Sequence, residues 1–365
     1  MNIRSIVFSL LGVFALHSAQ NADAASHHAT AQKPATNKRA SEKSDKGDKA
    51  EKTAKGGKTA PREQQARAEK PGKAQLARLR ADKARAGVQA ASFAPTPKGP
   101  EVDHEGNPLL QSAAFMIADQ STGAVLLEKN SDSVVPIASI TKLMTAMVVL
   151  DGHPNLAETM KVSTEDVDTL RGSSSHLPVG VELSREDMLR VALMSSENRA
   201  ASALARYYPG GLPAFVVAMN RKAQALGLRD THFSDSTGLN SANVSSARDL
   251  VKMVSAASRY PLIREFSTTA SYSVALNGRP RQFNNTNGLV KSPDWQIGVS
   301  KTGFINESGK CLVMQAWLLN KPVIIVLLDS FGRYTRVADA QRVKRWLESA
   351  AVQQRLASNT RGPAT

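Results

Sequence analysis

The chain has 365 residues, 41% of them hydrophobic, which is enough apolar material for one large domain or two small ones. The formal net charge of +15 is spread unevenly. Residues 25–100 hold 18 Lys and Arg against 7 Asp and Glu (+11), whereas residues 101–365 hold 28 against 24 (+4). The folded part is therefore only mildly basic. No nucleic-acid partner is expected, because the basic segment has one aromatic residue, Phe93, and no recognisable binding motif.

The first 24 residues have the pattern of a secretory signal peptide. Arg4 supplies a positive charge, and residues 6–16 form an apolar stretch of about 11 residues, too short to span a bilayer. Small residues at Ala22 and Ala24 match a cleavage site. We predict cleavage after Ala24 and export of the mature protein, with an uncleaved anchor as the alternative.

Residues 25–100 are rich in Ala, Lys, Gly, Thr and Pro, and they lack the apolar periodicity that a packed core requires. We predict a basic, disordered linker. A solvated tether is the simpler interpretation. The sharper interpretation is contact with an anionic wall polymer or membrane surface.

The composition gives no support to disulfide or metal chemistry. Cys311 is the only cysteine, so no intrachain disulfide can form, and its apolar neighbours predict a buried core residue. The histidines beyond residue 100 stand apart, without metal-ligand spacing: His104, His153, His176 and His232. We expect no metal site.

The fold is predicted to begin near Pro108 with strands. Two apolar runs, 115–118 and 125–127, flank a turn-rich link, which predicts a β-hairpin. A helix is expected over 140–150, followed by short strands and loops over 158–184.

The middle of the chain is predicted to be helical, and its last third returns to strands. The expected helices are 188–194, opened by a capping-box-like start at Ser184, then 199–207, 213–226, and one from Ser245 or Ser246 that ends before Pro261. The expected strands are 272–276, 295–299 leading into Lys301, 312–319 and 323–328, with a hairpin turn at 320–322 and a closing helix over 337–350.

This order of elements predicts an α+β fold: an antiparallel sheet flanked by helices, with an inserted all-helical lobe. Residues 101–350 form the expected domain, and residues 351–365 form a polar tail.

The strongest chemical signal is Ser139 and Lys142, three residues apart and just ahead of an apolar run. On a helix this spacing places the lysine amine beside the serine hydroxyl. A serine hydroxyl needs a base to become a nucleophile, and a lysine can be that base when burial and nearby positive charge lower its pKa. A serine that only caps a helix is the alternative.

Two further motifs follow downstream. Ser196-Glu197-Asn198 lies between two predicted helices, and Lys301-Thr302-Gly303 lies on a predicted strand. A second S-x-N sequence occurs at 241–243. We prefer the first copy because well-marked helices flank it on both sides.

Acyl transfer would give Ser139, Lys142 and Lys301 consistent chemical roles. Ser139 would attack a carbonyl, and Lys142 would accept its proton. Lys301, a second cation, would lower the pKa of Lys142 and attract an anionic substrate.

The remaining residues suit a peptide substrate. Ser196 would relay a proton to the leaving amine, Asn198 would hold the substrate backbone, and Thr302 would bind a substrate carboxylate. The strand edge from Thr302 through Gly303 to Phe304 would pair with an extended peptide. The backbone N–H groups of Ser139 and Phe304 would form the oxyanion hole.

The set S-x-x-K, S-x-N and K-T-G resembles the signature of penicillin-binding proteins and serine β-lactamases. Residues 101–350 resemble the low-molecular-mass serine D-alanyl-D-alanine peptidases of this group, and most of all the D-alanyl-D-alanine endopeptidases among them. The stretches that carry the resemblance are 136–146, 193–200, 208–211, 285–287 and 301–304.

The resemblance implies a β-lactamase/D,D-peptidase-like fold and a periplasmic hydrolase of cross-linked peptidoglycan. It implies cleavage between D-alanine and diaminopimelate through an acyl-enzyme on Ser139, and acylation of the same serine by β-lactams such as penicillin. It implies neither a metal nor an organic cofactor.

Two other enzymes and one binding protein are the alternatives. D,D-carboxypeptidases usually read Ser-Gly-Asn-Asp where this chain has Ser196-Glu197-Asn198-Arg199, and they tend to add a β-domain and an amphipathic tail that we do not find here. Class A β-lactamases need a deacylating glutamate that we cannot place. A catalytically idle β-lactam sensor or wall anchor is disfavoured by the intact Ser139 and Lys142.

Overall fold

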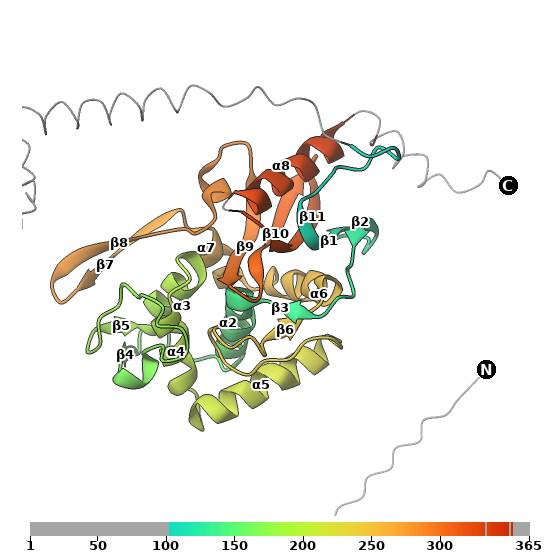
Figure 1. The fold of residues 1–365 in the computed structure, drawn as a ribbon. Coiled ribbons are helices and arrows are strands. Elements are labelled where there is room, and N and C mark those ends of the chain that lie inside the picture. Colours follow the sequence, from blue (N-terminus) through green and yellow to red (C-terminus); the bar gives the residue numbers. More distant parts are fainter. Residues whose placement is uncertain (1–101, 333, 350–351, 353–365) are drawn as a thin grey trace, which may run out of the picture. The chain divides into compact units, whose positions relative to one another are not determined.

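A five-stranded antiparallel sheet forms the centre of the domain (Figure 1). The strand order is β2-β1-β11-β10-β9, so β9 is an edge strand. The strands are β1 (Ser112–Asp119), β2 (Val125–Lys129), β9 (Gln296–Ile305), β10 (Gly309–Leu318) and β11 (Lys321–Ser330). Both predicted hairpins, β1–β2 and β10–β11, are present.

The structure, a computed structural model, describes residues 102–332, 334–349 and 352. The predicted signal peptide (1–24), the basic linker (25–100) and almost all of the polar tail lie outside the described residues and stay predictions. No helix in the described ranges is long and apolar enough to cross a membrane.

Both faces of the sheet are apolar, because successive strand residues point to opposite sides. On β10, Leu312 and Met314 join one core, whereas Cys311 and Val313 join the other. Helix α8 (Thr335–Glu348) covers the first face, where its residue Trp346 is buried. The helical part of the chain covers the second face.

An inserted segment between β2 and β9 forms the helical lobe, as predicted. Its elements are β3 (Val135–Pro136), η1 (Ala138–Ile140), α2 (Thr141–Asp151), β4 (Thr159–Lys161), η2 (Thr164–Asp166), β5 (Glu182–Ser184), α3 (Arg185–Met194), α4 (Asn198–Arg206), α5 (Gly211–Ala225), β6 (Val244–Ser245), α6 (Ala247–Ala257), α7 (Pro261–Thr268), β7 (Ser271–Leu276), β8 (Arg279–Asn284) and η3 (Gly288–Lys291). The α+β prediction is confirmed.

Helix α2 lies at the centre of the lobe, under β9 (Figure 1). Nine of its eleven residues are buried, including Lys142, because α3, α4, α5, α6 and α7 all contact it. A helix that is apolar all round belongs in a core. The central position of α2 fixes the side chains at its first turn.

Two of the longer elements, α7 and β8, were not predicted from the sequence. Pro261 was read as a helix stop, but it is the first residue of α7, where a missing N–H costs nothing. Strand β8 was missed because it is polar and exposed apart from Phe283. The turn before it, Asn277-Gly278, has positive φ at both residues, as a type I′ hairpin requires. The β7–β8 hairpin projects from the body of the domain (Figure 1).

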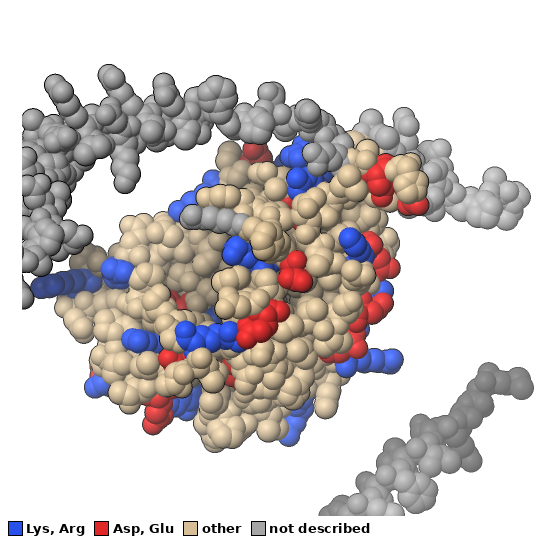
Figure 2. Space-filling view, viewed as in Figure 1, with Lys and Arg blue, Asp and Glu red and all other residues tan. Residues whose placement is uncertain are grey.

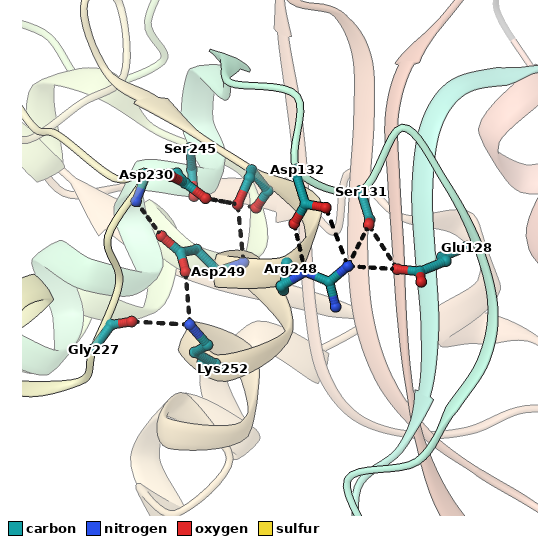
Figure 3. A network of polar contacts seen from close by, with 10 residues as sticks. Glu128, Ser131, Asp132, Gly227, Asp230, Ser245, Arg248, Asp249 and Lys252 are labelled. Carbon is teal, nitrogen blue, oxygen red and sulfur yellow. Dashed lines mark hydrogen bonds and ion pairs between the residues drawn. The ribbon is translucent and has the colours of Figure 1, made fainter.

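Neighbouring residues of α6 belong to two different polar networks (Figure 3). Asp249 is 1% exposed and accepts hydrogen bonds from the Asp230 N–H at 2.7 Å, the Thr231 hydroxyl at 3.0 Å and Lys252 Nζ at 2.9 Å. Arg248 is part-exposed and pairs with carboxylates that precede η1 in the chain.

These neighbours give a matched test of burial. We expect Asp249→Ala to lower the free energy of unfolding by about 2–3 kcal/mol, because it leaves buried donors without a partner. Arg248→Ala should cost less than about 1 kcal/mol, since exposed ion pairs contribute little. Urea denaturation of both variants measures the difference, and a larger loss for Arg248→Ala would contradict this account of the network.

Candidate active site

The hydroxyl of Ser139 lies beside the amine of Lys142 at the start of α2. Lys142 Nζ is 2.9 Å from Ser139 Oγ. The alternative in which Ser139 only caps the helix is wrong, because Ile140 is the N-cap of α2 and no side chain caps it. The serine side chain is therefore directed to the lysine.

Three acceptors surround the amine of Lys142. Besides Ser139 Oγ, Lys142 Nζ donates to Asn198 Oδ1 at 2.7 Å and to the Thr237 carbonyl at 2.7 Å. A protonated lysine has three N–H donors, so the charged form is fully satisfied. A neutral amine keeps two donors and gains a lone pair. It can hold Asn198 and Thr237 while it accepts the proton of Ser139.

Burial lowers the pKa of Lys142 to about 7, with the carboxylates of Asp235 and Glu197 opposing the shift. The side chain is 1% exposed, and a charge loses its hydration when it is buried. A substantial fraction of the amine is therefore neutral at physiological pH. Lys142 has the position and the protonation state that a general base needs.

A second buried lysine lies on β9. Lys301 Nζ is 2.9 Å from Ser196 Oγ and 2.9 Å from the Thr302 carbonyl. Its pKa is lowered well below its usual value, first by burial and then by the positive charges of Lys142 and Arg336. Burial is the first cause at both lysines, and the repulsion between their two charges opposes protonation of both at once.

Ser196 has an unusual backbone conformation, with φ of 63°. This left-handed conformation costs about 1–3 kcal/mol for a residue with a side chain. It lies in the short turn between α3 and α4, where the Glu197 N–H donates to the Val191 carbonyl at 3.2 Å. The turn directs Ser196 to Lys301 and Asn198 to Lys142, so the S-x-N motif joins the two lysines.

The outer edge of β9 is available to a substrate near Phe304. On an edge strand, alternate N–H groups point away from the sheet. The Ser300 N–H points outward, because it donates to Ser267 Oγ on α7 at 3.2 Å. Phe304 has the same parity, so its N–H also points to the outer edge.

Gly303 lets η1 approach this strand. A Cβ atom added there would lie 2.7 Å from the Ile137 carbonyl, closer than real Cβ atoms come to a neighbour. The glycine of K-T-G therefore brings Ser139, two residues beyond Ile137, next to β9. Gly238, with φ of 83°, allows a similar close approach at the Ala138 carbonyl from the other side.

Two residues beside Thr302 were not predicted as part of the site. Thr286 Oγ1 is 2.6 Å from Thr302 Oγ1, and its N–H is bonded to the Met194 carbonyl at the end of α3. Arg336 of α8 donates to the Gly303 carbonyl at 3.4 Å. Thr286 lies within the 285–287 stretch, which was noted only as part of the resemblance, whereas Arg336 carries no local sequence signal.

The second S-x-N copy has a structural role. Asn243 is completely buried and donates to Thr141 Oγ1 at 3.0 Å, and its Oδ1 accepts from the Ser234 N–H at 2.8 Å. It shapes the loop that carries Thr237. The side chain that reaches Lys142 is Asn198.

The loop 168–177 is attached to the S-x-N turn. The buried Glu197 carboxylate accepts from Ser175 Oγ at 2.6 Å and lies 2.8 Å from His176 Nδ1. Asn198 Nδ2 donates to Ser173 Oγ at 3.0 Å. Arg171 reaches Glu307, in the β9–β10 turn, at 2.9 Å. No local sequence signal predicts that this loop contacts the site, because its bonds join residues far apart in the chain.

The described residues contain no group of three His, Cys, Asp or Glu side chains that could hold a metal ion. The site consists of hydroxyl, amine and amide groups and backbone N–H groups. These groups suit nucleophilic acyl transfer by a serine.

Comparison with known proteins decides the family. A family model described as D-alanyl-D-alanine carboxypeptidase matches residues 101–332. The chain belongs to this family of serine D,D-peptidases. The predicted family, and with it a serine D-Ala-D-Ala peptidase, is confirmed.

The most similar curated relatives include two named D-alanyl-D-alanine endopeptidase. That of Pseudomonas aeruginosa is 49% identical over 269 residues, covering 72% of this chain and 84% of the relative. That of Escherichia coli is 48% identical over 249 residues, covering 67% and 80%. A D-alanyl-D-alanine carboxypeptidase of Streptomyces strain K15 is 34% identical over 257 residues, covering 66% and 88%.

Solved structures agree on the fold. The Streptomyces K15 DD-transpeptidase aligns with a TM-score of 0.62 at 31% identity, covering 66% of this chain and 97% of that chain. The β-lactamase/D,D-peptidase-like architecture predicted from the sequence is confirmed.

The close approach at Gly303 can be tested with a matched pair of glycines. Gly303→Ala should push β9 away from η1 and slow acylation of Ser139 by a fluorescent penicillin by about tenfold or more, because small misplacements of reacting groups are costly. Gly288→Ala is the control, since a Cβ there meets no atom within 4 Å. Equal labelling rates for the two variants would show that the close approach is not needed.

Proposed function

We propose that the protein is a serine D,D-endopeptidase that hydrolyses the D-alanyl–diaminopimelate cross-links of peptidoglycan. The observation that carries this proposal is the identity of 49% and 48% to two proteins named endopeptidase, against 28–34% for five named carboxypeptidase. The site described above supplies the chemistry that such a reaction needs.

Acylation begins with Ser139 and Lys142. The neutral amine of Lys142, 2.9 Å from Ser139 Oγ, takes the hydroxyl proton as the oxygen attacks the carbonyl of the D-alanine in the cross-link. The backbone N–H groups of Ser139 and Phe304 stabilise the oxyanion. A missing donor at such a site typically costs about 10²–10³ in rate.

Departure of the amine needs a proton. This proton is the one that Lys142 took from Ser139. The Ser196 hydroxyl, whose oxygen is 2.9 Å from Lys301 Nζ, relays it to the leaving amine, so that Lys142 is neutral again. A water molecule then attacks the acyl-enzyme, and Lys142 accepts a proton of that water and passes it to Ser139 Oγ as the ester bond breaks. This returns Ser139 to its free form and releases the shortened peptide.

Substrate binding is assigned to the residues around β9. An extended peptide adds to the open edge of the strand at Thr302–Phe304, and the Asn198 amide holds its backbone. The hydroxyl pair of Thr302 and Thr286 binds the carboxylate beside the cleaved bond. Arg336, which donates to the Gly303 carbonyl, supplies positive charge behind it, and Lys301 supplies an amine donor.

Peptidoglycan as substrate places the working enzyme in the periplasm. This agrees with the signal peptide predicted for residues 1–24. Acidic and basic side chains are interspersed over the face shown in Figure 2, so the described domain presents no broad patch of one charge there. We assign any attraction to anionic wall material to the basic segment 25–100.

Deleting residues 25–100 tests that assignment. Turnover of soluble muropeptides should stay unchanged, while binding to intact sacculi in a pull-down should fall and become insensitive to salt. Equal sacculus binding by both forms would make the segment a spacer.

The choice between endopeptidase and carboxypeptidase requires two substrates. A cross-linked tetrapeptide dimer and a pentapeptide monomer are incubated separately and followed by mass spectrometry. We expect conversion of the dimer to monomers with the pentapeptide largely intact, and no conversion by Ser139→Ala. Loss of terminal D-alanine with intact dimers would mean a D,D-carboxypeptidase, the alternative from the sequence.

The pKa of Lys142 predicts how acylation depends on pH. The neutral amine is the reactive form, so the rate of labelling by a fluorescent penicillin should rise about tenfold per pH unit below about pH 7 and level off above it. Lys142→Arg should label at least about a hundredfold more slowly at every pH, because an arginine stays protonated. A rate that is flat from acidic to alkaline pH, or normal labelling of Lys142→Arg, would refute Lys142 as the base.

A further inference from the structure

A cavity of about 470 Å³ lies at the end of the sheet opposite to the turn that carries Glu307. Its lining comes from the β1–β2 turn (Gln120, Ser121), from the end of α6 and from α7 (Ser258, Arg264), and from β10 (Gln315, Trp317). The volume is in the usual range for small-molecule sites. None of the active-site residues described above lines it.

Gln315 is the unusual residue of this cavity. It is 2% exposed, yet its Oε1 has no hydrogen-bond partner within the described chain. An unsatisfied buried amide is costly, and folded proteins rarely keep one without a reason. The oxygen faces Gly298, but the side chain lines the cavity, so a rotation about its last torsion would present the oxygen to a bound molecule.

Gly298 makes room for this amide. A Cβ at position 298 would collide with Gln315 Oε1 and lie 2.7 Å from the Trp317 ring. The glycine lies at a bulge in the pairing of β9 with β10. Strand β9 has no side chain at the point where Gln315 and Trp317 cover it. This keeps the amide and the indole ring next to the cavity.

Hydrogen bonds to Ser258 hold the side chains of Gln120 and Arg264 in place. Gln120 Nε2 donates to Ser258 Oγ at 2.8 Å, which leaves its carbonyl oxygen for a ligand. Arg264 donates to the Ser258 carbonyl at 2.8 Å and keeps further donors of its guanidinium. The described residues that line the cavity include no Asp or Glu.

We propose that this cavity binds an N-acetylated sugar unit of a glycan strand. An indole ring offers an apolar face for the C–H groups of a sugar, and amides and hydroxyls match groups that both donate and accept. The acetamido group of the sugar would bond to the Gln315 amide, which can present either its oxygen or its nitrogen after rotation about its last torsion.

The location suits a second contact with peptidoglycan. The choice of a glycan as the ligand rests on the proposed function. Gly298 and Lys301 are three residues apart on β9, about 10 Å along the strand. Helix α7 separates them: its Ser267 bonds to Ser300, and its Arg264 lines the cavity. A glycan strand held here would keep its stem peptides near the active site.

Tryptophan NMR signals of the full chain test the proposal without any turnover. The chain has three tryptophans, and Trp317→Phe identifies the indole signal of Trp317. Tetra-N-acetylchitotetraose should shift this signal saturably, while the signal of the buried Trp346 stays in place. Cellotetraose, which lacks the acetamido groups, should shift it at least tenfold less at equal concentration.

Two variants and a control link the shift to the cavity. Gln315→Met keeps the length of the side chain and should weaken binding at least tenfold, with an unchanged or higher melting temperature because it removes an unsatisfied amide. Ser121→Tyr, at the solvent side, should block the cavity without touching its buried groups. Gln282→Met is the control, since Gln282 is exposed on β8.

The outcomes are distinct. The proposal would be overturned if the Trp317 signal did not shift, or if Gln315→Met and Ser121→Tyr bound the sugar as well as the unmodified chain does. A shift with inorganic phosphate but not with the chito-oligosaccharide would also overturn it. Cleavage of soluble peptide dimers should be unchanged in Gln315→Met. A failure of the endopeptidase assay with an intact sugar shift would therefore refute the proposed function and leave this site standing.

Discussion

The burial of one amine controls the chemistry of this protein. Lys142 lies in the first turn of a helix that is surrounded by protein, and burial lowers its pKa to about 7. A charged group in such a place needs compensation, and the Ser139, Asn198 and Thr237 oxygens provide it. The fold therefore keeps the lysine in balance between its charged and neutral forms.

The rest of the site depends on bringing three chain segments close to that amine. Gly303 and Gly238 remove side chains on either side of η1, so that a strand and a loop can touch the backbone that carries Ser139. Ser196 adopts a strained conformation to bring the S-x-N turn between the two lysines. The two glycines and the strained serine thus position the catalytic side chains. The surrounding helices stabilise this arrangement.

Much of this arrangement could be predicted from the sequence, because its signals are local. The spacing of Ser139 and Lys142, the hairpins and the helices follow from periodicity and turn residues. The prediction that the helical region ends before Pro261 was wrong, since a proline suits the start of a helix as well as the residue after its end. It could not reveal Arg336 or the Glu197–Ser175 contact, because these pairings arise only when distant segments fold together. The burial that lowers the pKa of Lys142 likewise depends on helices from distant parts of the chain.

The pKa of Lys142 in the folded protein tests the central claim most directly. The full chain labelled with ¹³C at lysine Cε can be titrated by NMR, with Lys142→Arg identifying the signal. We predict a midpoint near pH 7, far from the value of about 10.4 of an ordinary lysine. A midpoint near 10 would mean that Lys142 stays charged at physiological pH, and it would contradict its role as the base.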